Sequence, residues 1–472
     1  MKAARTARRG GSPGNWPLFG AKVGLARALG AASRASGRGG GTTLPGRVLL
    51  KLDPDAIMRL GGRLEGGSTI VSATNGKTTT AGMIAAVLAA AGREPVHNRA
   101  GSNMTWGVAT ALLEQRGEEG LFEVDEAWLP RVAAQLDPGL IVLGNLFRDQ
   151  LDRYGELETL AEGWAELVAE RAGATRFALN ADDPLIADLG RDRESQPRPG
   201  VTYFGVEDPS QALPELQHAH DAKHCRRCGH PYAYERAFVG HLGHYRCPSC
   251  GASRPRPAVA AEAIELRGME GSSVSLRTPA GPLALELPLP GLYNVYNALA
   301  AITAALELGV GLERIGPALA GMQAVFGRVE TIEVAGKPVS ILLIKNPAGA
   351  NEVLRTLRLE SDGGSLDIWI ALNDRIADGR DVSWVWDADF ELLAGAVRRV
   401  VCAGTRAAEI ALRLKYAGLP TTAIEVEPSI GSSLDRALAA AQGRLFALPT
   451  YTALLELRTL LADRGLAQEY WR

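Results

Sequence analysis

Residues 68–80, STIVSATNGKTTT, constrain the fold of this chain more than any other stretch. Residues 68–72 form a β-branched run typical of a buried parallel strand, and residues 81–91 (AGMIAAVLAAA) are strongly helix-forming. Between them, Asn75 and Gly76 permit the tight turn that directs backbone N–H groups and a helix N-terminus at an anion. This order of strand, turn and helix predicts a phosphate-binding loop, and with it an α/β fold.

The loop departs from the common pattern G-x-x-x-x-G-K-[ST], because Val71 stands where the first glycine is expected. The rest of the chemistry is present. Lys77 is placed to reach terminal phosphates, and the Thr78 hydroxyl is placed to bind Mg²⁺. A helix cap that happens to precede a lysine is the alternative, and the flanking strand and helix argue against it.

Length and composition limit the class of protein. A chain of 472 residues has room for about two to four domains. Its net charge of −2 gives no overall field for nucleic acid, and no apolar run approaches the roughly 18–20 residues that span a bilayer. Four of the five cysteines form two C-x-x-C pairs, which favours a metal site in a reducing, cytoplasmic compartment over disulfides.

The N-terminal segment, residues 1–45, differs from the rest of the chain. The first 52 residues contain ten Lys or Arg and no Asp or Glu. Three interpretations stay open: an organelle transit peptide, a solvated tail with one packed helix, or a weakly amphipathic basic helix over residues 16–36 that contacts an anionic membrane surface.

Two further domains are predicted. Residues 46–328 begin with strands alternating with helices, which indicates a parallel sheet covered on both faces. Residues 329–472 form a second, Rossmann-like α/β domain. The expected strands of the first domain lie at roughly 68–73, 120–125, 139–145 and 175–180, followed by short antiparallel strands within 258–290 and a helix at 295–308; those of the second lie at 339–345, 366–371, 399–403 and 445–449, with helices such as 407–417.

An insertion at residues 223–257 contains the two cysteine pairs. Cys225 and Cys228 form the first pair, Cys247 and Cys250 the second, and each pair is followed by a glycine. This spacing is suited to two knuckles that close a tetrahedral zinc ribbon. Four thiolates fill the coordination shell, so the predicted metal is structural. A redox ribbon or a nucleic-acid-binding ribbon is the alternative.

Several stretches together resemble the Mur ligase family, and most closely its MurT branch. They are TNGKTTT (74–80), NRAGSNMTWGVATALL (98–113), FEVDEAWLP (122–130), GNLFRDQLDRYGELE (144–158), LNADDP (179–184), GLYNVYNALAA (291–301), FGRVE (326–330), KNPAGANEVL (345–354) and LNDRIADGRDVSWVWDADFE (372–391). The family loop reads G-T-N-G-K-[ST], so Ala73 replaces its first glycine and keeps the backbone close to the phosphates. The resemblance runs from about Thr43 to the C-terminus, and the UDP-binding domain of ordinary Mur ligases has no counterpart.

The resemblance implies a Mur-ligase-type central ATPase domain that binds ATP and Mg²⁺. Asn180, Asn294 and Asn297 would approach adenine, and Arg328 would reach the nucleotide from the domain boundary. Glu123 aligns with the family's magnesium-binding glutamate and would bind the ion together with Thr78, although Asp125 or Glu126 are alternatives. The implied nucleotide-binding residues are Thr74, Asn75, Gly76, Lys77, Thr78, Thr79, Asn180, Asn294, Asn297 and Arg328.

The implied reaction is ATP-dependent amidation of the α-carboxylate of D-glutamate in the stem peptide of lipid II. Such a reaction needs phosphate binding, Mg²⁺ and positive charge at the transferring group. Ammonia would come from a separate glutaminase that resembles GatD. Cys402, on an expected core strand, is more consistent with packing than with a nucleophile. Gln150 replaces a histidine that ordinary Mur ligases use for a second magnesium, so the number of metal ions stays open.

Asp374 is the second predicted catalytic residue besides Lys77. It follows an expected strand end, where α/β folds place their sites, and in MurT-like proteins a C-terminal aspartate is thought to complete the partner's Cys-His pair. Asp378 and Asp381 are the alternatives, and a loop-capping role is a third. Two other functions compete with the whole assignment: a Mur-type ligase that adds an amino acid, and a zinc-ribbon ATPase that binds nucleic acid. The Mur-specific stretches argue against nucleic acid.

Overall fold

The computed structural model describes residues 16–35, 43–98, 102–149, 157–218, 220–322, 330–361 and 365–466. Arg328 and Gln150 lie outside these residues, and so does the predicted boundary between residues 328 and 329. The chain divides into two compact units, one within Met1–Ile70 and Arg93–Gly139, the other within Val71–Gly92 and Leu140–Tyr470. The predicted domain boundaries differ from the boundaries of these two units, and the predicted domains stay a prediction.

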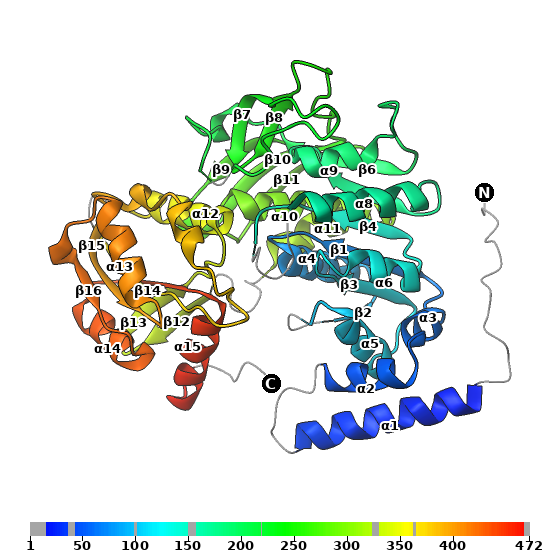
Figure 1. The fold of residues 1–472 in the computed structure, drawn as a ribbon, viewed down its shortest axis with the longest axis horizontal. Helices are drawn as coiled ribbons and strands as arrows, with labels where there is room; N and C mark the ends of the chain where they lie inside the picture. The colour runs from blue at the N-terminus through cyan, green and yellow to red at the C-terminus, as the bar shows by residue number, and fades with distance from the viewer. Residues whose placement is uncertain are drawn as a thin grey trace. The chain divides into compact units, whose positions relative to one another are not determined.

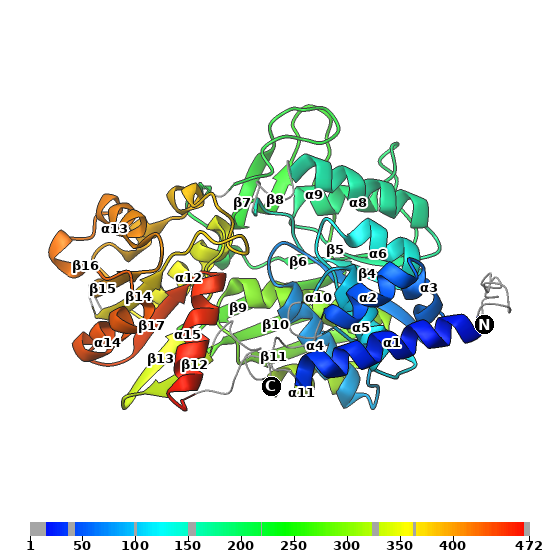
Figure 2. The same ribbon diagram turned by 60° about the horizontal axis from the view of Figure 1, so that its bottom comes forward.

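The first unit is mainly helical. Helix α1 (Trp16–Ala35) packs on α2 (Leu44–Leu52) and α5 (Thr105–Glu114) (Figure 2). The side chains of Phe19 and Ala26 on this helix are buried. Gly46 is required where α2 meets α5, because a Cβ there would lie 1.9 Å from the Trp106 carbonyl oxygen. The remaining elements are α3 (Ala56–Gly61), β2 (Val96–His97), β3 (Glu119–Glu123), α6 (Leu129–Leu136) and the first part of β1 (Gly67–Ser72).

The second unit contains a sheet in the order β11-β10-β9-β6-β5-β4-β1. Strands β4, β5, β6 and β9 pair in parallel, whereas β9, β10 and β11 pair in an antiparallel manner. The predicted strands and the predicted helix at 295–308 are therefore confirmed, while β6 was missed. The bounds are β4 (Leu140–Leu143), β5 (Arg176–Asn180), β6 (Val201–Val206), β9 (Val259–Leu266), β10 (Ser272–Thr278), β11 (Gly281–Leu287), α4 (Lys77–Ala90), α8 (Leu157–Arg171), α9 (Pro184–Ala187), α10 (Leu292–Glu307) and α11 (Leu312–Ala320).

The insertion interrupts this sheet between β6 and β9. It forms a separate antiparallel hairpin of β7 (Ala233–Val239) and β8 (Leu242–Arg246), visible in green in Figure 1. One cysteine pair precedes β7 and the other follows β8, so both pairs lie at the open end of the hairpin.

The C-terminal part of the second unit has its own six-stranded sheet, ordered β12-β13-β17-β14-β15-β16. All pairs are parallel except β12 with β13. The bounds are β12 (Glu330–Val334), β13 (Lys337–Ile341), α12 (Pro347–Leu359), β14 (Leu366–Ala371), β15 (Val397–Ala403), α13 (Ala407–Tyr416), β16 (Ile424–Val426), α14 (Ile430–Ala440), β17 (Leu445–Pro449) and α15 (Tyr451–Asp463).

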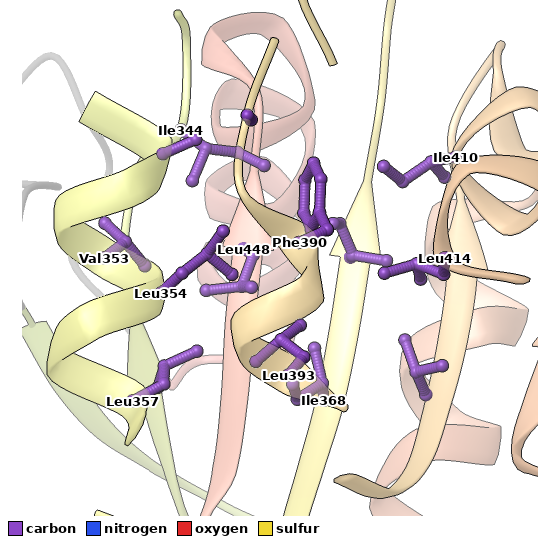
Figure 3. Close-up of a cluster of buried hydrophobic side chains, with 14 of the residues drawn as sticks. Ile344, Val353, Leu354, Leu357, Ile368, Phe390, Leu393, Ile410, Leu414 and Leu448 are labelled. Carbon is purple, nitrogen blue, oxygen red and sulfur yellow. The ribbon is translucent and has the colours of Figure 1, made fainter. Parts of the chain in front are cut away.

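Helices cover both faces of this second sheet. On one face, side chains of α12, α13 and the 3₁₀ turn Phe390–Leu393 pack on strand residues such as Ile368 and Leu448 (Figure 3). Residues of α14 and α15 form the core on the other face. The α/β arrangement expected for residues 329–472 is thus confirmed, and its Rossmann-like type stays a prediction. Cys402 is fully buried on β15 and burial raises the pKa of its thiol to about 12, which confirms a packing role.

Candidate nucleotide-binding site

The phosphate-binding loop connects β1 to α4 as the sequence predicts. Gly76 has a φ of 87° and comes directly before Lys77, the first residue of the helix. A Cβ at Gly76 would lie 1.9 Å from Asn297 Oδ1, so this position requires glycine for its backbone angle and for space. Helix α4 has no side-chain cap among the described residues. Its N-terminus can therefore serve an anion.

Side chains that follow β4 hold the beginning of the loop. The Asn145 side chain accepts a hydrogen bond from the Asn75 N–H (2.9 Å) and donates one to the Asn75 carbonyl (3.0 Å). The Phe147 N–H donates to Thr74 Oγ1 (3.0 Å), and the Thr74 N–H donates to the Asn145 carbonyl (3.0 Å). The N–H groups of Thr74 and Asn75 are thus engaged within the protein, which leaves phosphate binding to the backbone from Gly76 onward.

Lys77 is buried, and its ammonium group donates to the Ala73 carbonyl at 2.8 Å. This places a cation across the inside of the loop, where phosphate oxygens are expected. Thr79 is buried and lines the adjoining cavity, whereas Thr78 is half-buried.

A cavity lies beside the loop within the second unit. Apolar and polar side chains from four parts of the chain line it: the loop, the segment after β4, helix α10 and the start of α12, with two further side chains from the hairpin. The lining residues are Asn75, Gly76, Thr79, Asn145, Phe147, Val239, Leu242, Leu289, Tyr293, Asn294, Tyr296, Asn297, Leu343, Lys345, Ala348, Gly349, Glu352 and Val353.

Two of the three asparagines expected near adenine face this cavity. Asn297 donates to Asn294 Oδ1 at 3.1 Å and accepts from the Thr80 hydroxyl at 3.3 Å. Asn180 does not line the cavity. It is buried at the end of β5, where its amide donates to the Gly144 carbonyl (2.9 Å) and accepts from the Asp182 N–H (2.9 Å).

The structure adds residues that the sequence reasoning assigned no role. Lys345 donates to the Thr74 carbonyl at 3.2 Å and pairs with Asp149. Asn346 and Asn75 exchange two side-chain hydrogen bonds of 3.0 and 3.2 Å, while Asn346 also caps α12. The signal was the stretch KNPAG, in which an Asn-Pro pair marks a helix start next to a lysine. A second cation therefore lies at the phosphate-binding loop.

Glu352 is a buried carboxyl group of the same cavity. Burial raises its pKa, while its partner Arg355 (2.8 Å) opposes the shift.

The predicted magnesium ligands, Thr78 and Glu123, belong to different units and are described separately. Glu123 is buried at the end of β3. The Asn98 side chain accepts from the Glu123 N–H (2.9 Å) and donates to its carbonyl (2.8 Å), and Asn103 lies 3.5 Å from its carboxylate. Asp125 and Glu126 are also buried. Buried carboxylates beside a strand end are suitable oxygen ligands for Mg²⁺.

The four cysteines of the insertion come together as predicted. Their sulfur atoms all lie within 4.8 Å of one another, with Cys225–Cys250 at 3.6 Å and Cys228–Cys247 at 3.4 Å. Gly229 and Gly251 adopt φ of 73° and 76° and close the two knuckles. Four thiols this close together are suitable ligands for a Zn²⁺ ion, whose Zn–S bonds are about 2.3 Å.

The three candidate aspartates of the C-terminal part differ in their surroundings. Asp374 is half-buried and accepts from the Thr405 hydroxyl and from Arg406 Nε, both at 2.8 Å, and these bonds lower its pKa. Asp378 is buried and accepts from the Thr452 N–H (2.7 Å) and hydroxyl. Hydrogen bonding to the Ser383 side chain, and then to the Ser383 N–H at 2.8 Å, lowers the pKa of Asp381.

Comparison with known proteins places the chain in a family. Residues 71–245 match the Mur ligase middle domain, and residues 343–454 match the MurT ligase C-terminal family. Among solved structures, a pseudomurein peptide ligase type C from Methanothermus fervidus has a TM-score of 0.67 at 22% identity, covering 87% of this chain and 81% of the other. The MurF ligase from Thermotoga maritima in complex with ADP has a TM-score of 0.60 at 14% identity, covering 89% and 85%. These likenesses support the fold.

Two curated relatives are each named lipid II isoglutaminyl synthase (glutamine-hydrolyzing) subunit MurT. The protein from Streptococcus pneumoniae is 34% identical over 91% of this chain and 94% of its own length. The protein from Staphylococcus aureus strain N315 is 32% identical over the same shares of the two chains. The chain therefore belongs to the MurT family of ATP-dependent ligases.

Proposed function

We propose that this protein activates the α-carboxylate of D-glutamate in the lipid II stem peptide for amidation to D-isoglutamine. A carboxylate oxygen would attack the γ-phosphorus of ATP, releasing ADP and forming an acyl phosphate. Ammonia would then attack the acyl carbon, phosphate would leave, and the amide would lose a proton. One observation carries the proposal: an uncapped helix N-terminus, Lys77 and Lys345 meet at one loop beside a cavity.

In this proposal the chain's cations stabilise charge that moves during phosphoryl transfer. Lys77 would exchange its contact with the Ala73 carbonyl for the β- and γ-phosphates, and Lys345 would approach from the other side of Thr74. Thr78 of the second unit and Glu123 of the first are each a proposed ligand of Mg²⁺, whose charge offsets that of the phosphates. Asn294 and Asn297 would contact the base, and Arg328 and Asn180 are further proposed nucleotide contacts.

A separate glutaminase that resembles GatD is the proposed ammonia source. Asp374 has the properties required to orient a histidine of such a partner, because it is ionised, partly exposed and fixed by Thr405 and Arg406. We propose the four cysteines as a structural zinc site.

Helix α1 supports a proposed contact with an anionic membrane, where a lipid-linked substrate resides. Leu18, Leu25 and Leu29 follow one stripe of this helix and are 61%, 51% and 41% exposed, and the N-terminal segment is basic. No described helix is long and apolar enough to cross a membrane. Serine at all three leucines should abolish flotation of the protein with vesicles rich in phosphatidylglycerol, and unchanged flotation would refute this contact.

The decisive experiment uses purified chain with a GatD-like glutaminase, glutamine, lipid II, ATP and Mg²⁺. Mass spectrometry should detect loss of about one mass unit per stem peptide, the difference between –OH and –NH₂, with ADP and phosphate formed in equal amounts. Turnover with a free amino acid instead of ammonia or glutamine would favour an amino-acid-adding ligase.

A further inference from the structure

The hairpin of the insertion reaches the nucleotide loop. Its two strands start and end at the cysteine pairs, and its turn, Gly240 and His241, lies at the opposite end. Val239 and Leu242 next to the turn line the nucleotide cavity. The insertion therefore contributes directly to the site, beyond closing its own fold.

His241 is the residue at the centre of this contact. Its side chain is fully buried, its ring lies 4.6 Å from the Phe147 ring, and its Nε2 lies 3.3 Å from Asp183 Oδ2. Neither ring nitrogen has a hydrogen-bond partner within the described ranges of the chain. A polar ring buried in this way is costly, which indicates that its position serves a purpose other than stability.

The contacts continue from His241 to the phosphate-binding loop. Asp183 Oδ2 also accepts from the Leu146 N–H at 2.8 Å. The ring of the next residue, Phe147, lies tilted against the His241 ring, and its N–H donates to Thr74 Oγ1 of the loop. His241 thus contacts Phe147 and also Asp183, which binds the neighbouring Leu146. Residues 145–147 in turn hold Thr74 and Asn75.

The cysteine end is one support of the hairpin. It pairs with no other strand in the described structure, and an isolated two-stranded hairpin is at best marginally stable in water. Metal binding to four thiolates supplies folding free energy to such knuckles. Contacts away from the cysteines also hold it: the Leu213 N–H donates to the Ala237 carbonyl (2.7 Å), and the Gly243 N–H donates to the Asp182 carbonyl (2.9 Å). Arg355 of α12 donates to the Phe238 carbonyl at 2.8 Å.

We propose that the cysteine insertion is a metal-dependent clamp on the nucleotide loop, with His241 as its positioning residue. Occupancy of the knuckles would fix the hairpin, the hairpin turn would fix Asp183 and Phe147, and these would hold Thr74 and Asn75 in the shape that binds phosphate. Loss of metal at the cysteines would then lower nucleotide affinity. This inference rests on the proposed ATP site and adds its regulation.

The test measures the Kd of the full chain for a fluorescent ATP analogue with Mg²⁺, without lipid substrate. His241→Ala should weaken binding roughly five- to thirtyfold, the factor that corresponds to about 1–2 kcal/mol, while zinc content stays unchanged. His241→Gln, which keeps a polar group near Asp183, should recover part of the affinity. Wild-type protein freed of metal by a chelator should lose a similar factor and regain it when Zn²⁺ is returned.

His244→Ala is the matched control. His244 belongs to the same hairpin, but its Nε2 lies 2.9 Å from the Val206 carbonyl and away from the nucleotide cavity lining. This variant should lower the melting temperature and keep the nucleotide Kd. Unchanged affinity in His241→Ala, or equal loss in both histidine variants, would overturn the clamp. Wild-type protein that binds no nucleotide would overturn the proposed function itself.

Discussion

The two sheets of the second unit both place polar loops at the carboxyl ends of parallel strands, and the helices that follow carry different groups at their N-termini. In each sheet an asparagine after a strand ties neighbouring loops together: Asn145 holds Asn75 after β1, and Asn373 holds Thr405 after β15 and Thr452 after β17. The helices that follow differ. Within the described residues, the N-cap residue of neither helix supplies a side-chain cap. The difference is that the Thr452 N–H in the first turn of α15 donates to the Asp378 carboxylate, whereas the first residue of α4 is the cation Lys77.

The comparison shows why a strand end alone does not identify a site. An α/β edge becomes an anion site when the chain leaves a helix N-terminus without a carboxylate of its own and adds cations. Asp378 fills the equivalent place in the C-terminal sheet, so its role is structural in our interpretation. Asp374, which precedes Asp378 in the same segment after β14 and is half-buried, stays our proposed contact for the partner.

Lys77→Ala should give the largest effect. Removing the cation at the uncapped helix should lower ATP turnover by about 10²–10³-fold, the range seen when one charge-stabilising donor is lost. The melting temperature should change little, because the charge matters most when phosphate is bound. Steady-state ADP release with lipid II and glutamine measures this, and near-wild-type turnover would remove the loop from the mechanism.

Asp374→Asn should affect amidation differently with glutamine and with ammonia as the nitrogen donor. We expect glutamine-driven amidation to fall by about 10²-fold, since an orienting carboxylate is lost, while ammonia-driven amidation stays largely intact. Amidation rates with each donor are compared directly. Equal loss with both donors would place Asp374 in the synthetase site, and no loss with either would make it structural.

Lys345→Ala should weaken ATP turnover by roughly tenfold, the loss of about 1.4 kcal/mol expected for a second, partly exposed cation. The KM for ATP and kcat should both be measured, because Lys345 also holds Asp149 and the Thr74 carbonyl. Lys415→Ala, an exposed change on α13, is the control. Equal activity of the two variants would contradict a role for Lys345.

Asp378→Asn should have the smallest effect, and on stability alone. Burial is the largest influence on Asp378 and raises its pKa, so folding favours the protonated form. The stability that this preference contributes is present at low pH and is lost as pH rises through the folded-state pKa. The melting temperature of the asparagine variant relative to wild type should therefore increase from pH 4 to pH 7. A constant difference would contradict the raised pKa.

Much of the fold could be predicted from local sequence. The strand at β1, the glycine turn and α4 are encoded within about 25 residues, as are the knuckles and the strands β14 and β17, because burial patterns, turn residues and cysteine spacing act over short distances. The short strands β2, β12 and β16 and the middle strand β6 escaped notice, since their strand character depends on pairing with distant neighbours.

The residues of the candidate site also fall into those predicted from sequence and those identified only in the tertiary structure. The sequence by itself determined the phosphate-binding loop, Lys77 and the four-cysteine cluster, whose geometry depends on nearby residues. Tertiary structure alone decided that Lys345 and Asn346 reach a loop some 270 positions earlier in the chain, that Asn180 is occupied by backbone groups, and that His241 lies against Asp183 and Phe147. Hydrophobic periodicity in the sequence does not predict such contacts, because they form only when separate elements pack and bury their polar groups together.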